Sequence, residues 1–193
     1  MIFTLDIAAL PEGYGEAVLP VGAAKAHLRV LHDDEDDLIK ALRDAAVEMV
    51  EQYTGLVLGP RVGADALVWR AESVPGWGPV LMGRRPIRSI ASITHLDSAG
   101  GEQAIDPTTF RVIDQDSIVP KSGQWPSGIS GGVVVTFAAG LDEGAVPAPL
   151  VTAAKMFLAT LYANRETIVT DGAAGHVTAG FAMLCRPYRR IRV

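Results

Sequence analysis

The pattern of apolar and polar residues predicts a long helix in the first third of the chain. In HDDEDDLIKALRDAAVEMVEQYTG, apolar side chains recur three and four positions apart, so they share one helix face: Leu38, Leu42, Ala45, Met49, Val50 and Tyr53. Asp33 or Asp34 is expected to cap its start, and Gly55 to end it. The preceding GAAKAHLRV predicts a shorter helix, so the two form a helical hairpin linked by LHDD.

Between residues 56 and 140 the pattern changes to short runs that are typical of strands. The runs ALVWR, PVLM, SIASITHL, TFRVI and GVVVTFA are rich in β-branched and aromatic residues and are separated by turn-forming residues. The segment LDSAGGEQAI predicts a hairpin, because Asp97, Gly100 and Gly101 tolerate the dihedral angles of a turn. We therefore expect a β-rich insertion between helices.

A second strong helix is predicted in VPAPLVTAAKMFLATLYANRE. Pro147 or Pro149 suits its first turn, where a missing N–H costs nothing. Apolar side chains then occupy almost every direction around the axis, which indicates burial on more than one side and predicts a second subunit as a partner. The residues predicted for this subunit interface are Leu150, Met156, Phe157, Leu161 and Tyr162.

These patterns predict an α+β fold that is mainly helical, with a small helical bundle, a β-rich insertion and an extended C-terminal tail. A single domain is expected over residues 1–170, with helices at about 21–55 and 147–165 and the insertion at about 56–140. Residues 171–193 are expected to form a flexible linker and a docking tail, because TDGAAGHVTAG holds three glycines among small residues.

The last eight residues carry four arginines, although the formal net charge of the chain is −5. Three interpretations of this basic tip remain open: a frayed solubilising end, a nucleic-acid contact, or docking into an acidic groove of another protein. Arginine forks bind carboxylates in a bidentate manner, and Tyr188, Ile191 and Val193 add apolar contacts. The mixture favours the protein groove.

We predict no catalytic, cofactor or metal site. Cys185 is the single cysteine, and His27, His32, His95 and His176 fall in four different predicted elements. The acid run DDEDD resembles a calcium loop, but Leu38 stands where that loop needs glycine, so helix capping explains the run better. A small hydrolase built from distant His and Asp residues is the least favoured alternative.

No membrane residence is predicted. The N-terminal segment lacks the features of a signal peptide. The most apolar stretch, from Leu150 to Tyr162, contains Lys155 and is shorter than the roughly 20 residues that a span needs.

The order of these pieces resembles the head–tail connector or adaptor proteins of long-tailed bacteriophages and gene transfer agents. The matching pieces are AKAHLRVLHDDEDDLIKALRDAAVEMVEQYTG, RRPIRSIASITHLDSAG, QWPSG, VVVTFAAG, VPAPLVTAAKMFLATLYANRE and CRPYRRIRV. They cover roughly residues 19–193, and several pieces in order are more specific than any one of them. Residues 1–18 match nothing in this pattern.

The resemblance implies a structural protein without enzymatic activity, located in the neck of a virion or phage-like particle and assembled in the host bacterial cytoplasm. Such proteins form a homo-oligomeric ring of about twelve subunits beneath the portal protein, with a stopper or tail-completion protein on the other side and DNA passing through the lumen. Their C-terminal segment reaches the portal, which implies these docking residues here: Phe181, Leu184, Arg186, Tyr188, Arg189, Arg190 and Arg192. The alternative is a nucleic-acid-binding or packaging accessory protein that uses the basic tip.

Overall fold

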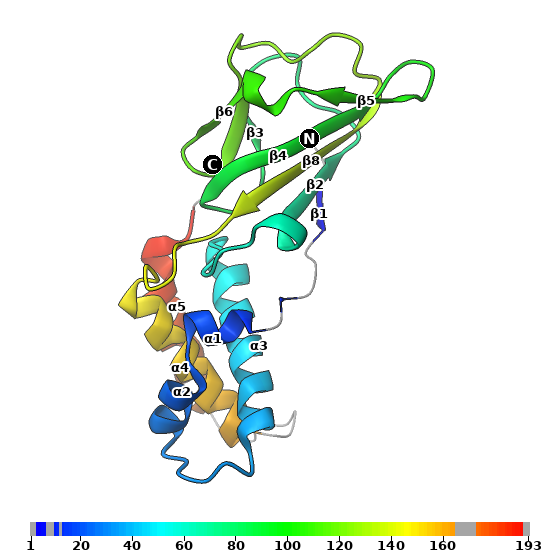
Figure 1. The fold of residues 1–193 in the computed structure, drawn as a ribbon. Helices are drawn as coiled ribbons and strands as arrows, with labels where there is room; N and C mark the ends of the chain where they lie inside the picture. Colours follow the sequence, from blue (N-terminus) through cyan, green and yellow to red (C-terminus); the bar gives the residue numbers. More distant parts are fainter. Residues whose placement is uncertain (1–2, 7–9, 12, 165–172, 191–193) are drawn as a thin grey trace. The chain divides into compact units, whose positions relative to one another are not determined.

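The structure is a computed structural model that describes residues 3–6, 10–11, 13–164 and 173–190, and these form two compact units (Figure 1). The β unit contains Phe3–Asp6 and Pro60–Gly140. The helical unit contains Leu10–Gly59 and the chain from residue 141 onward. Within the described residues, none of the helices combines the length and the apolarity that a membrane span requires.

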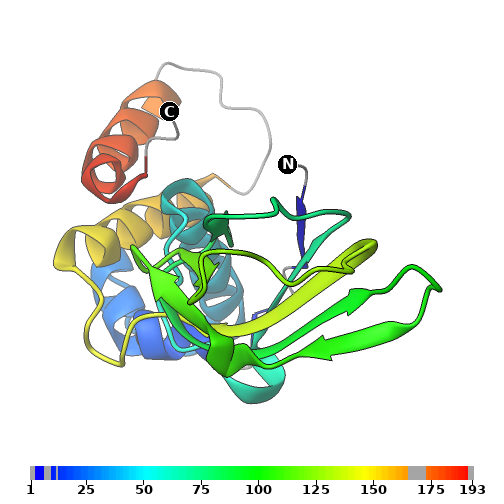
Figure 2. The same cartoon turned by 90° about the horizontal axis from the view of Figure 1, so that it is seen from above.

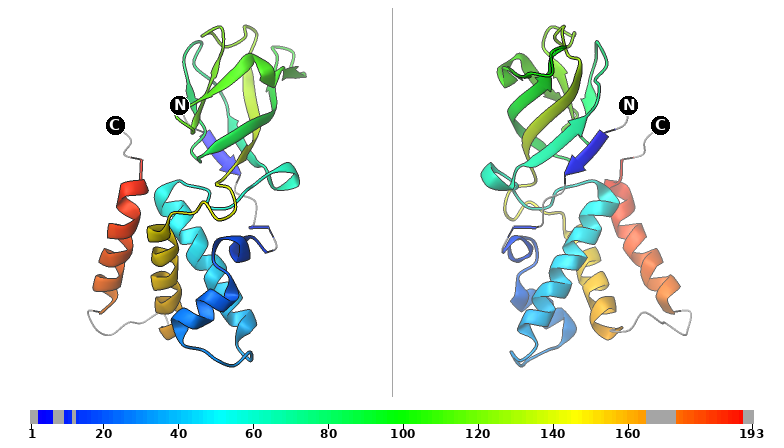
Figure 3. Two further views of the ribbon diagram at one scale, coloured as in Figure 1. Left: turned by 60° about the vertical axis from the view of Figure 1, so that its left-hand side comes forward. Right: turned by 90° about the vertical axis from the view of Figure 1, so that its right-hand side faces the viewer.

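Five α-helices make up the described part of the helical unit, and three of them, α3, α4 and α5, lie side by side (Figure 3). Their bounds are α1 Tyr14–Val18, α2 Val21–Leu28, α3 Asp36–Thr54, α4 Ala148–Ala163 and α5 Ala173–Cys185. A short 3₁₀ turn, η3, follows at Arg186–Tyr188. Fully buried apolar side chains fill the space between the helices, among them Leu19, Ile39, Val47, Leu58, Leu150 and Leu158.

The predicted helical hairpin is confirmed as α2 and α3, but the start of α3 differs from the prediction. Glu35 occupies the N-cap position and makes no side-chain capping bond. The Asp33 carboxylate instead accepts a hydrogen bond from Lys25 Nζ at 2.5 Å, so it ties the linking loop to α2. Gly55 ends the helix as predicted, with φ of 73° and its N–H donating to the Glu51 carbonyl at 2.8 Å.

The apolar positions that mark α3 in the sequence are mostly not the ones that it buries. Its inner face carries Ile39, Ala46, Val47 and Val50, all fully buried, together with the buried polar residues Arg43, Glu51 and Thr54. Of the six residues in the predicted apolar set, only Val50 belongs to this face. Leu38, Ala45 and Met49 are exposed, and the remaining two, Leu42 and Tyr53, are half-buried. The helix therefore has two apolar faces.

α4 is confirmed close to its predicted bounds, with Pro147 at the N-cap and Pro149 in the first turn. The segment after it was expected to be a linker with a tail, yet α5 occupies Ala173–Cys185. The three glycines of TDGAAGHVTAG disfavour a helix, and for that reason the sequence predicts a linker there. The division of the chain at residue 170 stays a prediction.

The β unit is built from two antiparallel sheets. The larger has the strand order β1-β2-β8-β4-β5, and the smaller has the order β3-β7-β6. The long strands β4 (green) and β8 (yellow-green) lie next to each other in the larger sheet (Figure 2). The strand bounds are β1 Phe3–Asp6, β2 Leu67–Ala71, β3 Val80–Leu81, β4 Ile87–Leu96, β5 Glu102–Ile105, β6 Phe110–Ile113, β7 Ser117–Pro120 and β8 Gly131–Ala139. Two 3₁₀ turns, η1 at Gly63–Asp65 and η2 at Pro107–Thr109, complete the unit.

Alternate residues of β2 and β8 face the same core. Trp69 pairs with Val135 and Leu67 with Phe137, and all four side chains are at most 2% exposed. Phe3 of β1 stacks on Trp69 with ring centroids 5.7 Å apart. The period of two between buried positions is what one sheet face packed on a core produces.

The predicted hairpin is confirmed as β4 and β5, which are joined by the turn that begins at Asp97. The Asp97 carboxylate accepts hydrogen bonds from the N–H groups of Ala99 and Gly101 at 2.9 and 2.8 Å, and from Gln103 Nε2 at 3.0 Å. The Gly101 N–H, then the Gln103 amide and the Ala99 N–H hold the pKa of Asp97 below its usual value.

The prediction of a mainly helical fold is wrong. In the described residues, eight strands in two sheets form a unit of their own, beside a unit of five helices. The strands were recognised as separate runs, but their number was underestimated because the short strands β1 and β7 carry no strong alternation. The fold is mixed α and β.

Candidate docking site

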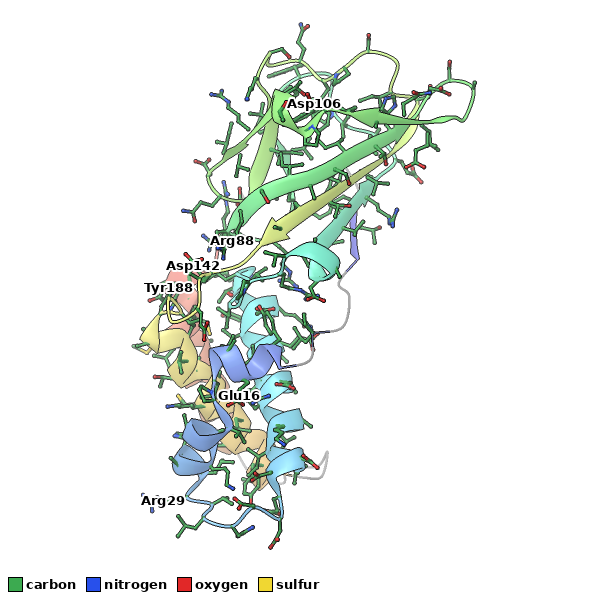
Figure 4. The ribbon with its side chains drawn as sticks, viewed as in Figure 1. Glu16, Arg29, Arg88, Asp106, Asp142 and Tyr188 are labelled. Atoms are coloured by element: carbon green, nitrogen blue, oxygen red, sulfur yellow. The ribbon has the colours of Figure 1, made fainter. Side chains whose placement is uncertain are left out.

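The C-terminal end of α5 is the part of the helical unit where the predicted docking residues can be placed. α5 leads directly into η3, and Arg189 and Arg190 follow. The Arg189 N–H donates to the Arg186 carbonyl at 3.1 Å, which closes the turn around Pro187. Tyr188 lies at this end of the segment (Figure 4). Arg192 lies outside the described residues.

Phe181 fastens this segment to the helical unit. Its side chain is 6% exposed and meets Tyr53 of α3 edge-on, with ring centroids 5.5 Å apart. It also meets Phe157 of α4 at 5.6 Å. Aromatic pairs of this geometry add about 0.5 to 1.5 kcal/mol each beyond the area that they bury. The side chain of Phe181, which was predicted as a docking residue, is therefore packed inside its own chain.

The remaining predicted docking residues divide into half-buried and exposed positions. Leu184 and Tyr188 are half-buried, whereas Arg186, Arg189 and Arg190 are exposed. The Arg189 guanidinium lies over the Tyr53 ring, 5.3 Å from its centroid, which is cation–π geometry. The segment thus has an apolar side that packs on α3 and α4, and exposed arginines, of which Arg189 also covers the Tyr53 ring.

Cys185 lies between these two sides and is fully buried. Burial raises the pKa of its thiol to about 11, so the thiol stays protonated and unreactive at neutral pH. This residue packs as a small apolar side chain. The described residues contain no cluster of three His, Cys, Asp or Glu side chains that could hold a metal ion.

The predicted subunit-interface residues of α4 make contacts inside the helical unit. Leu150 is fully buried, while Met156, Phe157, Leu161 and Tyr162 are half-buried. Met156 lies close to α5, since a Cβ added to Gly180 would stand 2.9 Å from its methyl group. The Tyr162 hydroxyl donates a hydrogen bond to the Glu35 carboxylate. The apolar surface of α4 is thus largely covered by helices of its own chain, and its predicted role between subunits stays a prediction.

Sequence reasoning missed two residues of this region. Tyr53 supports both Phe181 and Arg189, and the only signal for it was its place in the apolar pattern of α3. Met183 is 78% exposed beside the buried Cys185, and it points away from the unit. An exposed methionine next to exposed arginines gives the segment the mixed apolar and cationic character of a protein-binding surface.

Comparison with known proteins gives two results. Residues 21–75 match the model of a family described as phage gp6-like head–tail connector proteins. No curated protein matches the chain.

Several solved structures share the whole fold. A chain in the neck of an empty GTA particle computed with C6 symmetry has a TM-score of 0.75 and 25% identity, covering 100% of this chain and 97% of that one. A chain in the virion of a native gene transfer agent particle has a TM-score of 0.73 at 23% identity, with the same coverage. A chain in the neck of a native GTA particle computed with C12 symmetry has a TM-score of 0.71 and 22% identity, again with the same coverage. The resemblance predicted from the sequence is confirmed.

Proposed function

Because this chain resembles the head–tail connector proteins of phages and gene transfer agents in a family match and in its whole fold, we propose that it is a structural part of a particle neck. The observation that carries the proposal is the match in fold to a gene transfer agent neck chain over 100% of this chain and 97% of the other.

The proposed assembly is a ring of about twelve copies. Neighbours of similar fold stand in necks computed with C12 and C6 symmetry, which supports repeated copies around an axis. The ring lies under the capsid portal, receives a stopper or tail-completion protein on its other side, and lets DNA pass through its lumen. A formal net charge of −5 supports this last role, because a basic lumen would bind the passing phosphates. No chemistry is assigned to the chain, and it assembles in the host bacterial cytoplasm.

The C-terminal segment is proposed to dock on the portal. Arg186, Arg189 and Arg190 are exposed, and Phe181 packs the segment against Tyr53 of α3. Arginines on a segment that is already packed lose less conformational entropy on binding than arginines on a free tail do, and the Arg189 guanidinium is already held over the Tyr53 ring. Replacing an arginine whose carboxylate pair becomes desolvated should cost about 2 to 5 kcal/mol of docking energy, and replacing one at the rim should cost little.

The test is removal of residues 186–193 from the full chain. We expect a folded protein with an unchanged circular dichroism spectrum that no longer co-purifies with its portal. The matched pair of point variants is Arg186→Gln, in the segment, and Arg29→Gln, an exposed arginine after α2. Only the first should weaken portal binding. Full portal binding by the truncated protein would contradict the docking role.

The alternative function is nucleic-acid binding by the same exposed arginines. It predicts a mobility shift of duplex DNA that weakens steeply with salt, because each phosphate contact releases counterions. The connector proposal predicts little affinity. If the truncated protein loses the DNA mobility shift but still binds the portal normally, the result would favour the alternative.

A further inference from the structure

We propose that the outer face of α3 binds the outer face of α4 on a second copy of this chain. The outer face of α3 consists of Leu38, Ala41, Leu42, Ala45 and Met49. The outer face of α4 consists of Ala148, Thr152, Lys155, Ala159 and Ala163. The inference rests on the ring of the proposed function and names the surfaces that join its subunits.

The first observation is the second apolar face of α3. Leu38 and Met49 are each 38% exposed, and Ala45 between them is also exposed. With Leu42 they are spaced by four, three and four residues, which is the spacing of a seam between two packed helices. A surface helix with one buried face normally carries polar residues on the opposite side. This outer face has the pattern of a helix that meets another helix.

Ring symmetry determines which kind of surface can cover it. In a closed ring of more than two copies, each contact joins two different patches of the same chain. The outer face of α3 therefore cannot pack on its own counterpart in the neighbour. The partner has to be another surface that each copy also presents.

The outer face of α4 fits in shape. Ala148, Thr152 and Ala163 are exposed, Ala159 is half-buried, and every residue of this face except Lys155 is small. Small side chains let a second helix approach closely, and large side chains such as Leu38 and Met49 fill the space that they leave. The large residues of one face and the small residues of the other are complementary in volume.

The two faces are also complementary in charge. Asp37, Asp44 and Glu48 border the outer face of α3 on one side, and Lys155 is the one charged residue of α4. Asp37 pairs with Lys40 at 3.0 Å and Asp44 with Arg43 at 2.9 Å, so Glu48 is the acid that a lysine of the neighbour would meet. Glu48 is hydrogen-bonded by Gln52 Nε2 at 3.0 Å and stays half-buried on the outside of the helix. A lysine brought against this acidic border in the neighbour would fix the direction in which copies associate.

Disulfide trapping in particles tests the contact. Ala45 is central in α3, while Thr152 and Ala159 flank the centre of α4, so two double variants cover both relative helix directions: Ala45→Cys with Thr152→Cys, and Ala45→Cys with Ala159→Cys. The native Cys185 is fully buried and adds little background. The controls are the three single variants and Ala45→Cys with Ser98→Cys, in which the second cysteine lies in an exposed turn of the β unit.

Particles are purified, oxidised mildly and separated without reducing agent. We expect at least one double variant to give a ladder of covalent multimers, with on the order of tenfold more multimer than any control. The proposal would be overturned if necks that contain the protein yielded only monomer from both double variants. Covalent dimers from Ala45→Cys alone would also overturn it, because they would place α3 against α3.

A charge exchange gives a second measurement. Lys155→Glu should lower incorporation of the protein into necks on the order of tenfold, and adding Glu48→Lys in the same chain should restore it. Equal incorporation of the wild type, the Lys155→Glu variant and the double variant would show that charge does not direct the contact. If the wild-type protein is missing from purified necks, the proposed function fails. If it is present and neither trapping nor charge exchange has an effect, only this inference fails.

Discussion

The Tyr14 hydroxyl donates a hydrogen bond to Glu51 Oε1, although the two residues lie 37 positions apart in the sequence. Both are buried, at 6% and 5% exposure. The same hydroxyl accepts the Gly59 N–H at 2.7 Å, and Glu51 Oε1 accepts the Leu58 N–H at 2.6 Å. This network joins α1, the end of α3 and the segment after it, and so it fixes where the chain leaves the helical unit.

Tyr14→Phe should therefore destabilise the protein by about 1 to 3 kcal/mol, because it removes one donor from a buried carboxylate and one acceptor from a buried N–H. Urea unfolding measures the loss. Tyr162→Phe is the matched control: its hydroxyl also bonds a glutamate, but both residues are half-buried, so its effect should stay below about 1 kcal/mol. Equal losses in the two variants would show that burial of the network is not what stabilises the protein.

Periodicity predicted the long elements well because their signals are strong and local. α3, α4 and the β4–β5 hairpin appear where the pattern places them. Periodicity could not tell which apolar face of α3 is buried. Leu38 and Met49 recur with the same helical spacing as Ile39 and Val50, and only the packing of α4, α2 and α1 on α3 decides which of the two faces is buried.

Three elements could not be predicted because non-local contacts form them. β1 has four residues and exists by pairing with β2, 65 positions or so further along the chain. α1 has five residues and is held by Glu16, whose carboxylate accepts a hydrogen bond from the buried Arg43 (Figure 4). α5 contains two glycines, and the burial of Phe181 and Cys185 near its end outweighs the propensity that they cost. The arginines of the C-terminal segment singled it out in the sequence, but nothing there indicated its aromatic support by Tyr53.

Phe181→Ala should release the end of α5 from α3 and α4. The deleted ring contacts Tyr53 and Phe157, and removal of a buried phenylalanine costs about 3 to 5 kcal/mol of local packing. Amide hydrogen exchange in residues 179–190 should become much faster. Met183→Ala, in the same helix but 78% exposed, should leave exchange unchanged. Similar exchange rates in the two variants would mean that Phe181 does not anchor the segment.

Asp97 should make the β4–β5 hairpin sensitive to acid. Hydrogen bonds from the Gly101 N–H, the Gln103 amide and the Ala99 N–H lower the pKa of its carboxyl below 3.8 in the folded protein. A lowered pKa contributes stability above the unfolded-state value, and this contribution disappears as the pH falls through the folded-state value. Asp97→Asn should therefore be less stable than the wild type at pH 7, with the difference narrowing below about pH 4. A difference independent of pH would indicate that the charge of Asp97 plays no part.

Cys185 should be protected from alkylation as long as α5 stays packed. Its pKa of about 11, raised by burial from 9.0, leaves about a hundredfold less thiolate near pH 8 than an ordinary cysteine has. Iodoacetamide labelling followed by mass spectrometry should thus be at least about a hundredfold slower in buffer than in urea. A raised pKa contributes stability below pH 9, which is lost as the pH rises from 9 towards 11. Cys185→Ala should therefore lose less stability between pH 9 and pH 11 than the wild type does. Rapid iodoacetamide labelling of the folded wild type would show that the end of α5 is not packed against α3 and α4.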